Sequence, residues 1–343
     1  MESGYSTVII DTGTSTIKAG LSSDMYPRVE IPTQTPEDYA NEQARPIMER
    51  GIVTNWKRLE DVWSNVIYDK LGVKSPGEVL IYLTERVLNP KANREKMLQI
   101  MMEEFQFGVV SFNRNTTCSM IGSGRLSGTT LELGGGISSV VPIYDGYALP
   151  HAVQCLDVAG DDITEYLMSM LHQSGTSINR DIARNIKEST AYVSTDPEID
   201  NSLLPNIYTL PDGRVVSIST ERYKCVEPIF DPSLLGLKGP GIHQLIAGTY
   251  KRLESNNPYF RNLILSGGSS LFPGLQERLH RELASTLQPT IKPSYTILPY
   301  RKHLAFYGAC IITSMSNFLL SQNTFSMAEY EESGPSLVHR KIY

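Results

Sequence analysis

The feature that most constrains the fold is the stretch VIIDTGTSTIKAG at residues 8–20. Three apolar residues lead into Asp11, small residues follow, and a second strand-like run begins at Thr16. This pattern predicts a strand, a tight turn and a second strand, and the amides of such a turn can surround an anion. Asp11 would then hold a hydrated Mg²⁺ beside the anion, and Lys18 would add a positive charge. An ordinary hairpin with a small polar turn is the alternative interpretation of this stretch alone.

The same pattern returns in the second half of the chain. Residues 129–133 form an expected strand, residues 134–136 a glycine turn and residues 138–144 a second strand. An Asp-Gly hairpin turn and a third extended piece follow. In the first half, three short strands are likewise expected one after another over residues 6–32. One such unit in each half of the chain predicts two related domains that face each other.

A third glycine turn, SGG, comes directly after the expected strand at residues 263–265. One glycine turn is weak evidence for a ligand, because turn chemistry is common. Three turns at the carboxyl ends of strands, two of them inside a repeated unit, indicate a nucleotide phosphate held between two domains.

Helices are expected where apolar residues recur at helical spacing. These segments lie around residues 59–72, 90–105, 163–171, 178–193, 273–283 and 304–320. In the fourth of them Arg184, Lys187 and Glu188 share one face. A solvated charged face is the alternative interpretation of that cluster.

Length and composition limit the class of protein. A chain of 343 residues exceeds one ordinary core, which predicts two domains. A net charge of −6 gives no indication of a nucleic-acid partner. No apolar run approaches a membrane span, and the N-terminus lacks the basic start and apolar core of a secretory signal. The four cysteines form no CxxC motif, which favours free thiols in a reducing compartment.

Five segments, in this order, resemble actin: RGIVTNW, LNPKANREKMLQIM, VPIYDGYALPHA, LSGGSSLFPG and ESGPSLVHRK. The resemblance covers nearly the whole chain. It implies an α/β fold of two RNase-H-like domains around a cleft that holds ATP (or ADP) with Mg²⁺. The first domain would comprise residues 1–115 with 305–343, and the second residues 116–304.

The resemblance also implies which residues contact the nucleotide. Those holding the phosphates from the first domain would be Gly13, Thr14, Ser15 and Lys18, and those from the second Gly134, Gly135 and Gly136. Asp11 would bind the hydrated cation. The adenosine pocket would be lined by Arg184, Lys187, Glu188, Gly267, Gly268, Ser269, Phe272 and Lys302. Phe272 stands where actins usually have Tyr, so it keeps a stacking surface and loses a hydroxyl.

Three departures fall on the catalytic positions. The family orients its attacking water with a Gln, an Asp and a His, where this chain has Asn115, Gly135 and Ser139; Glu132 replaces another Asp. Phosphoryl transfer depends mainly on positioning, and a misplacement of about 1 Å can cost around 100-fold in rate. We therefore predict nucleotide binding with slow or absent hydrolysis. The alternative is that the site shifted as a whole and Glu132 covers for the missing carboxylate.

Two further comparisons with actin concern assembly. Residues 33–49, expected to be an exposed loop, are shorter than actin's insertion and lack the loop that reaches into the next filament subunit, which should weaken an open helical assembly. The oily segment at residues 230–242 corresponds to actin's inter-strand plug and is retained. The apolar groove where actin partners dock could take an amphipathic helix. Its lining would be Ile121, Gly124, Leu126, Ile311, Ile312, Met315 and Phe318.

Three functions follow from these comparisons. The first is a structural actin-like subunit within a larger assembly of cytoskeletal, axonemal dynein-arm or nuclear remodelling type. The second is a filament-forming actin ATPase, and the third an enzyme of the superfamily such as a sugar kinase or a heat-shock-type chaperone. The actin-like tail argues against the third, and the departures favour the first. The expected location is the cytoplasm and cytoskeleton, with axoneme or nucleus as further possibilities.

Overall fold

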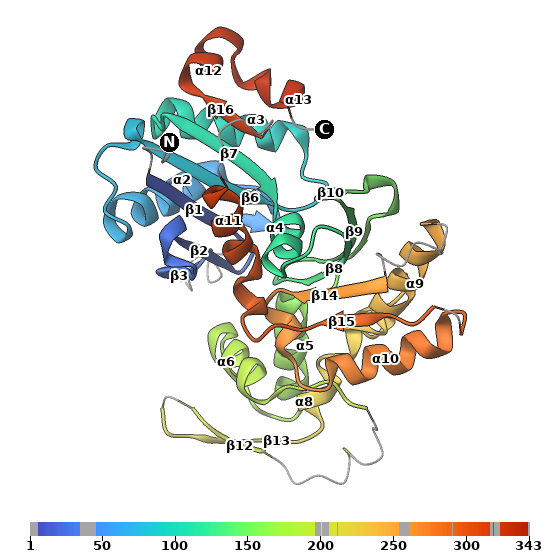
Figure 1. Cartoon of the computed structure of the whole chain (residues 1–343). Helices are drawn as coiled ribbons and strands as arrows, with labels where there is room; N and C mark the ends of the chain where they lie inside the picture. The colour runs from blue at the N-terminus through green and yellow to red at the C-terminus, as the bar shows by residue number, and fades with distance from the viewer. Residues whose placement is uncertain are drawn as a thin grey trace.

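Two six-stranded mixed β-sheets form the framework of the protein (Figure 1). The computed structural model describes residues 6–34, 46–195, 200, 206–210, 212–253, 261–289, 291–315, 318 and 323–341. The first sheet contains β1 (Ser6–Thr12), β2 (Thr16–Leu21), β3 (Val29–Pro32), β6 (Val79–Glu85), β7 (Val109–Arg114) and β16 (Thr324–Ser326). The second contains β8 (Gly128–Leu133), β9 (Ser138–Tyr144), β10 (Tyr147–Ala148), β11 (Gln154–Leu156), β14 (Asn262–Ser266) and β15 (Ser294–Thr296). The strand orders are β16-β7-β6-β1-β2-β3 and β10-β9-β8-β14-β15, with β11 paired to β9.

The described helices cover these sheets. They are α2 (Trp56–Ser64), α3 (Lys91–Gln99), α4 (Asn115–Gly122), α5 (Gly160–Gln173), α6 (Arg180–Thr190), α8 (Glu221–Lys224), α9 (Ile242–Arg252), α10 (Leu275–Thr286), α11 (Leu304–Ser314), α12 (Met327–Ser333) and α13 (Val338–Lys341). Two small hairpins, β4 (Met48–Glu49) with β5 (Ile52–Val53) and β12 (Asn206–Thr209) with β13 (Val215–Ile218), stand apart from the sheets. No helix within these described ranges is long and apolar enough to cross a membrane.

The two sheets are built alike, as the repeated sequence pattern predicts. In the first, β1 pairs antiparallel with β2 and parallel with β6. In the second, β8 pairs antiparallel with β9 and parallel with β14. In each half of the chain the first strand of the sheet is central and forms a hairpin with the next strand. Each sheet therefore has a tight turn at the carboxyl end of its central strand. The mixed α/β fold class is confirmed.

Both faces of the first sheet are buried, because alternate residues of a strand point to opposite faces. Val8 and Ile10 on β1 belong to the core that contains Trp63 of α2, whereas Ile9 packs with Phe306 of α11. Figure 1 shows α2 and α3 on one side of this sheet and α11 on the other. Strands buried on both faces read as continuous apolar runs, which is the pattern of the sequence here.

The second sheet is covered in the same way. Leu131 and Leu133 on β8 pack with helices such as α5 and α10, while Ile264 on β14 packs with Met120 of α4 and Leu304 of α11. Helices α4 and α11 thus lie between the two sheets (Figure 1). The division of the chain into domains at residues 115/116 and 304/305 stays a prediction, and its boundaries fall at the beginnings of these two helices.

Two expected segments differ in the structure. The helix expected over residues 304–320 ends at Ser314, and Met315 is already extended, with φ −71° and ψ 136°. The loop expected to be exposed at residues 33–49 is buried at both ends, at Thr33 and Gln34 and at Ile47 and Met48. Residues 35–45, on which the absence of a filament-contact loop depends, lie outside the described residues.

Glycine allows α4 and α11 to approach backbone to backbone. A Cβ at Gly308 would lie 1.8 Å from the carbonyl oxygen of Cys118, and a Cβ at Gly122 would lie 2.7 Å from that of Leu304. Real Cβ atoms essentially never approach other heavy atoms this closely, so neither position accepts a side chain without movement of a helix. The spacing between the sheets depends on this contact.

We predict opposite effects for the same substitution in two helices. Gly308→Ala should lower the free energy of unfolding by about 2 kcal/mol or more, because the added methyl overpacks the crossing. Gly248→Ala, inside α9, should raise it by about 0.5–1 kcal/mol, since its Cβ would find the nearest atom at 3.8 Å and Ala favours a helix. Urea unfolding followed by circular dichroism measures both. Equal effects at the two sites would contradict the close-crossing interpretation.

Candidate functional site

A cavity of about 320 Å³ lies between the two halves of the chain. Its walls are the β1–β2 turn, the β8–β9 turn, the start of α5, one face of α6 and the turn after β14. Its volume is within the range of small-molecule sites. The predicted catalytic, nucleotide and metal residues that line it are Asp11, Gly13, Thr14, Ser15, Lys18, Asn115, Glu132, Gly134, Gly135, Gly136, Arg184, Lys187, Glu188, Gly267, Gly268, Ser269, Phe272 and Lys302. Ser139 does not line it.

The two hairpin turns have the same internal geometry. The amide of Gly13 donates to the carbonyl of Thr16 at 3.1 Å, and the amide of Gly134 donates to that of Ile137 at 3.2 Å. Within the described part of the chain, the intervening amides of Thr14, Ser15, Gly135 and Gly136 have no hydrogen-bond acceptor. Each turn therefore offers two N–H groups without an acceptor at the wall of the cavity, and groups of this kind can bind an anion.

Asp11 and Lys18 form a charged pair at the end of β1. Asp11 is almost buried and accepts hydrogen bonds from Thr84 Oγ1 and, at 3.3 Å, from Lys18 Nζ. Burial alone would lower the pKa of Lys18, but the charge and hydrogen bond of Asp11 outweigh it and raise that pKa. Lys18 therefore keeps its charge at neutral pH and can pair with a phosphate. Asp11 offers an oxygen ligand of the kind that a hydrated Mg²⁺ prefers.

Glu132 adds a second carboxyl group beside this pair. Burial, reinforced by the negative charge of Asp11, raises the pKa of Glu132 to about 7. Its Oε2 atom is buried without a hydrogen-bond partner among the described residues. A buried carboxyl oxygen without a donor is the kind of atom that a cation or its bound water would satisfy. The residues at this end of the cavity thus fit a hydrated divalent cation.

The other two catalytic positions differ from each other. Asn115 begins α4 and lines the cavity, but its side-chain oxygen accepts from the amide of Thr116 at 2.8 Å. Ser139 lies directly opposite Glu132 on β9 and is buried in the sheet, outside the cavity wall. Because directly opposed residues of paired strands place their side chains on the same face of the sheet, Ser139 lies beside Glu132, and its part in orienting a water stays a prediction.

Lys187 connects α6 to α5 at the side of the cavity that α6 lines, where the resemblance predicts the adenosine pocket. Only 6% of it is exposed, and Nζ donates to the carbonyl of Gly160 at 2.8 Å and to Thr164 Oγ1 at 2.9 Å. Burial lowers the pKa of this lysine. The solvated-face interpretation is therefore wrong for Lys187, although Glu188, one residue on, is exposed. Phe272 is largely buried in the neighbouring core and presents only part of its side chain to the cavity.

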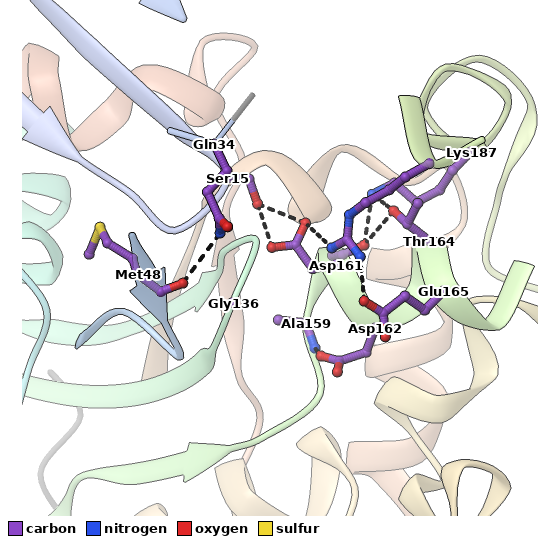
Figure 2. A network of polar contacts seen from close by, with 12 residues as sticks. Ser15, Gln34, Met48, Gly136, Ala159, Asp161, Asp162, Thr164, Glu165 and Lys187 are labelled. Carbon is purple, nitrogen blue, oxygen red and sulfur yellow. Dashed lines mark hydrogen bonds and ion pairs between the residues drawn. The ribbon is translucent and has the colours of Figure 1, made fainter. Parts of the chain in front are cut away.

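Sequence reasoning missed two residues that connect the halves. Asp161, at the start of α5, accepts the hydroxyl of Ser15 at 2.9 Å (Figure 2). Arg50 makes a two-pronged ion pair with Asp162, with contacts of 2.6 and 2.7 Å, and donates to the carbonyl of Gly136 at 3.2 Å. Nothing local in the sequence indicates that Asp161 and Asp162 meet partners more than a hundred positions away.

The apolar groove is only partly available. Ile121, Ile311 and Ile312 are half-buried, and Gly124, Leu126 and Met315 are exposed, as a docking surface requires. Phe318 is wrong as a groove residue, because it is 7% exposed and packs on Tyr82 with ring centroids 5.8 Å apart.

Two sheets with the same strand pairing, and a cavity between their facing hairpin turns, define a two-lobed α/β protein with a candidate binding site in the cleft. A family model described as Actin matches residues 3–180 and 175–343. Because these two matches span nearly the whole sequence, the chain belongs to the actin family.

Glu132 predicts a pH dependence of stability that can be measured without ligand. Its pKa rises from an ordinary value of 4.5 to about 7 in the folded protein. The folded state therefore binds the proton of Glu132 more tightly than the unfolded state does. The contribution of the protonated carboxyl group to the free energy of unfolding is complete below pH 4.5 and is lost as the pH rises through 7. In EDTA at pH 8, Glu132→Gln should melt on the order of 3 °C above the parent protein, and the difference should shrink toward pH 4.5. The exposed Glu104→Gln serves as control, and a pH-independent difference would contradict the assignment.

Proposed function

We propose that this actin-family chain is a structural subunit that binds an adenine nucleotide, ATP or ADP, with Mg²⁺ in the cavity between its lobes. The observation that carries this proposal is the pair of facing turns, each with two free amides, beside Lys18. Phosphate groups are bound in proteins by such amides together with a positive charge. Family membership supports the same conclusion, since actins generally bind ATP or ADP with Mg²⁺.

Each side chain at the phosphate end would have a separate task. The amides of the two turns would donate to phosphate oxygens from opposite sides, and Lys18 would balance their charge. Asp11 and Glu132 would accept hydrogen bonds from the water shell of the cation, which Mg²⁺ gives up reluctantly. A bound Mg-nucleotide would supply the anionic phosphate oxygens with which the turn amides and Lys18 can pair. The adenosine would lie against α6 and the turn at Gly267 and Gly268.

We further propose that hydrolysis is slow or absent. Gly135 offers no carboxylate, Ser139 is buried in the sheet, and the oxygen of Asn115 is engaged by its own helix. Few groups then remain to orient a water for in-line attack. Positioning of the attacking water is a large part of catalysis in phosphoryl transfer. Glu132 is the one residue on which the alternative depends, because its pKa near 7 suits a general base.

The filament-forming ATPase is the second candidate, and one observation favours it. On the segment at residues 230–242, Leu234 is 45% exposed and Leu237 38%. Exposed leucines beside a positive-φ glycine, Gly236, are unusual for a surface that meets only water.

We nevertheless propose that this protein assembles with itself weakly or not at all. It would act within a larger protein assembly in the cytoplasm and cytoskeleton, including an axonemal or nuclear complex.

Phosphate release tests the chemistry. Protein loaded with ATP labelled at the γ-phosphate and Mg²⁺ should release phosphate at least about 100-fold more slowly than conventional actin measured alongside, because the water is poorly placed. Lys18→Ala should retain little nucleotide, which locates the bound ATP in this cavity; the exposed Lys57→Ala should retain it fully. Stoichiometric release at the rate of conventional actin would return the protein to the ATPase candidate.

Sedimentation tests self-assembly. At low micromolar concentration in Mg²⁺ and salt, this protein should stay in the supernatant under conditions that pellet conventional actin. The physical reason is the shortened segment at residues 33–49, which leaves a head-to-tail contact without one of its sides. Abundant filaments in the pellet, seen by electron microscopy, would contradict the structural-subunit proposal.

A further inference from the structure

Ser15 and Asp161 connect the two lobes at the turns themselves. The hydroxyl of Ser15 lies 2.9 Å from both carboxylate oxygens of Asp161, although the residues are 146 positions apart in sequence. Figure 2 shows Ser15 reaching from the first hairpin and Asp161 from the start of α5, side chain to side chain. The contact is held from both sides, because Asp161 also pairs with Arg180 at 3.4 Å.

The side chain of Ser15 fills the space beside Gly135. A Cβ at Gly135 would lie 1.7 Å from Ser15 Oγ, and a Cβ at Gly136 would lie 2.4 Å from Thr14 Oγ1. The side chains of the first turn are thus in direct contact with the second turn, beside the cavity that both turns line. An anion that took amides from both turns at once would have to push them apart.

Further bonds fix the second turn to the helix that carries Asp161. The amide of Asp161 donates to the carbonyl of Gly135 at 2.8 Å, and the amide of Gly160 donates to that of Gly134 at 3.0 Å. Movement of the second turn away from the first would therefore carry the start of α5 with it. Such a movement would break the Ser15–Asp161 hydrogen bond, so separation of the turns has a defined energetic cost.

We propose that Ser15 and Asp161 form a clasp across the two turns, so that the cleft accepts a nucleoside diphosphate in preference to a triphosphate. This inference rests on the proposed function, in which the cavity holds an adenine nucleotide. Figure 2 shows Asp161 between Ser15 and Lys187, which marks the adenosine end. A nucleotide with its base against α6 reaches the turns with the outer end of its phosphate chain. The terminal phosphate of a triphosphate is then the group that meets the closed clasp.

Calorimetry with two nucleotides tests the clasp. With Mg²⁺, the parent protein should bind ADP at least about tenfold more tightly than the non-hydrolysable β,γ-imido analogue of ATP. Ser15→Gly, which removes both the bond and the bulk, should bring the two affinities close together. Asp161→Asn, which keeps the shape and removes the charge, should reduce the preference by a smaller factor.

Asp162→Asn is the matched control. It removes one carboxylate from the same helical turn and weakens the Arg50 ion pair across the cleft, yet leaves Ser15 and Asp161 in place. The ratio of the two affinities should stay that of the parent protein. A changed ratio in this variant would mean that general loosening of the lobes, and not the clasp, sets the preference.

Each remaining outcome decides between the proposals. Equal affinities of the parent protein for the two nucleotides would overturn the clasp and leave nucleotide binding intact. A preference for ADP that persists in Ser15→Gly and Asp161→Asn would likewise overturn it. Failure to bind either nucleotide would overturn the proposed function, and the clasp with it.

Discussion

The close crossing of α4 and α11 sets the distance between the two sheets. At Gly308 a Cβ would meet the carbonyl oxygen of Cys118 at 1.8 Å, so the helices touch through their backbones. Each sheet rests on this same pair: Cys118 faces the core of the first sheet and Met120 that of the second. Because close-packed interiors transmit displacement, a change in the crossing would change the separation of the two hairpin turns. The width of the cavity is thus set by a contact outside it.

The chemistry of the cavity follows from that placement and from the repeated hairpin. In a tight turn at the end of a central strand, some amide N–H groups lie where no neighbouring strand supplies a carbonyl acceptor. Two such turns face each other among the described residues. Neither turn alone would hold a phosphate well, since each offers only two amides. Under the proposed function the repeat therefore matters for binding as well as for folding, because the two halves would hold the anion together.

The sequence predicted the central strands and their turns, because these depend on local periodicity and turn residues. The resemblance to actin supplied most of the predicted residues that line the cavity. It did not predict the links between distant segments. Ser15 meets Asp161 across 146 positions and Arg50 meets Asp162 across 112, and no local pattern marks such pairs. Ser139 was placed at the site by resemblance alone, and only the structure shows that it is buried, opposite Glu132 on the neighbouring strand. The end of α11 at Ser314 was missed because the apolar run continues past it.

The ion pairs and hydrogen bonds already present in the cavity determine how much free energy the binding of a polyanion would require. The three lysines among the described residues that line the cavity are already engaged: Lys18 with Asp11, Lys187 with the carbonyl of Gly160, and Lys302 with Glu30 at 2.8 Å. A polyanion would therefore exchange existing contacts for new ones, and its affinity would reflect the difference between the two sets. The contacts at Asp161 and Asp162 hold the lobes together as well. Ligand affinity and closure of the cleft are consequently linked, because the same side chains that would meet a ligand stabilise the closed arrangement of the protein.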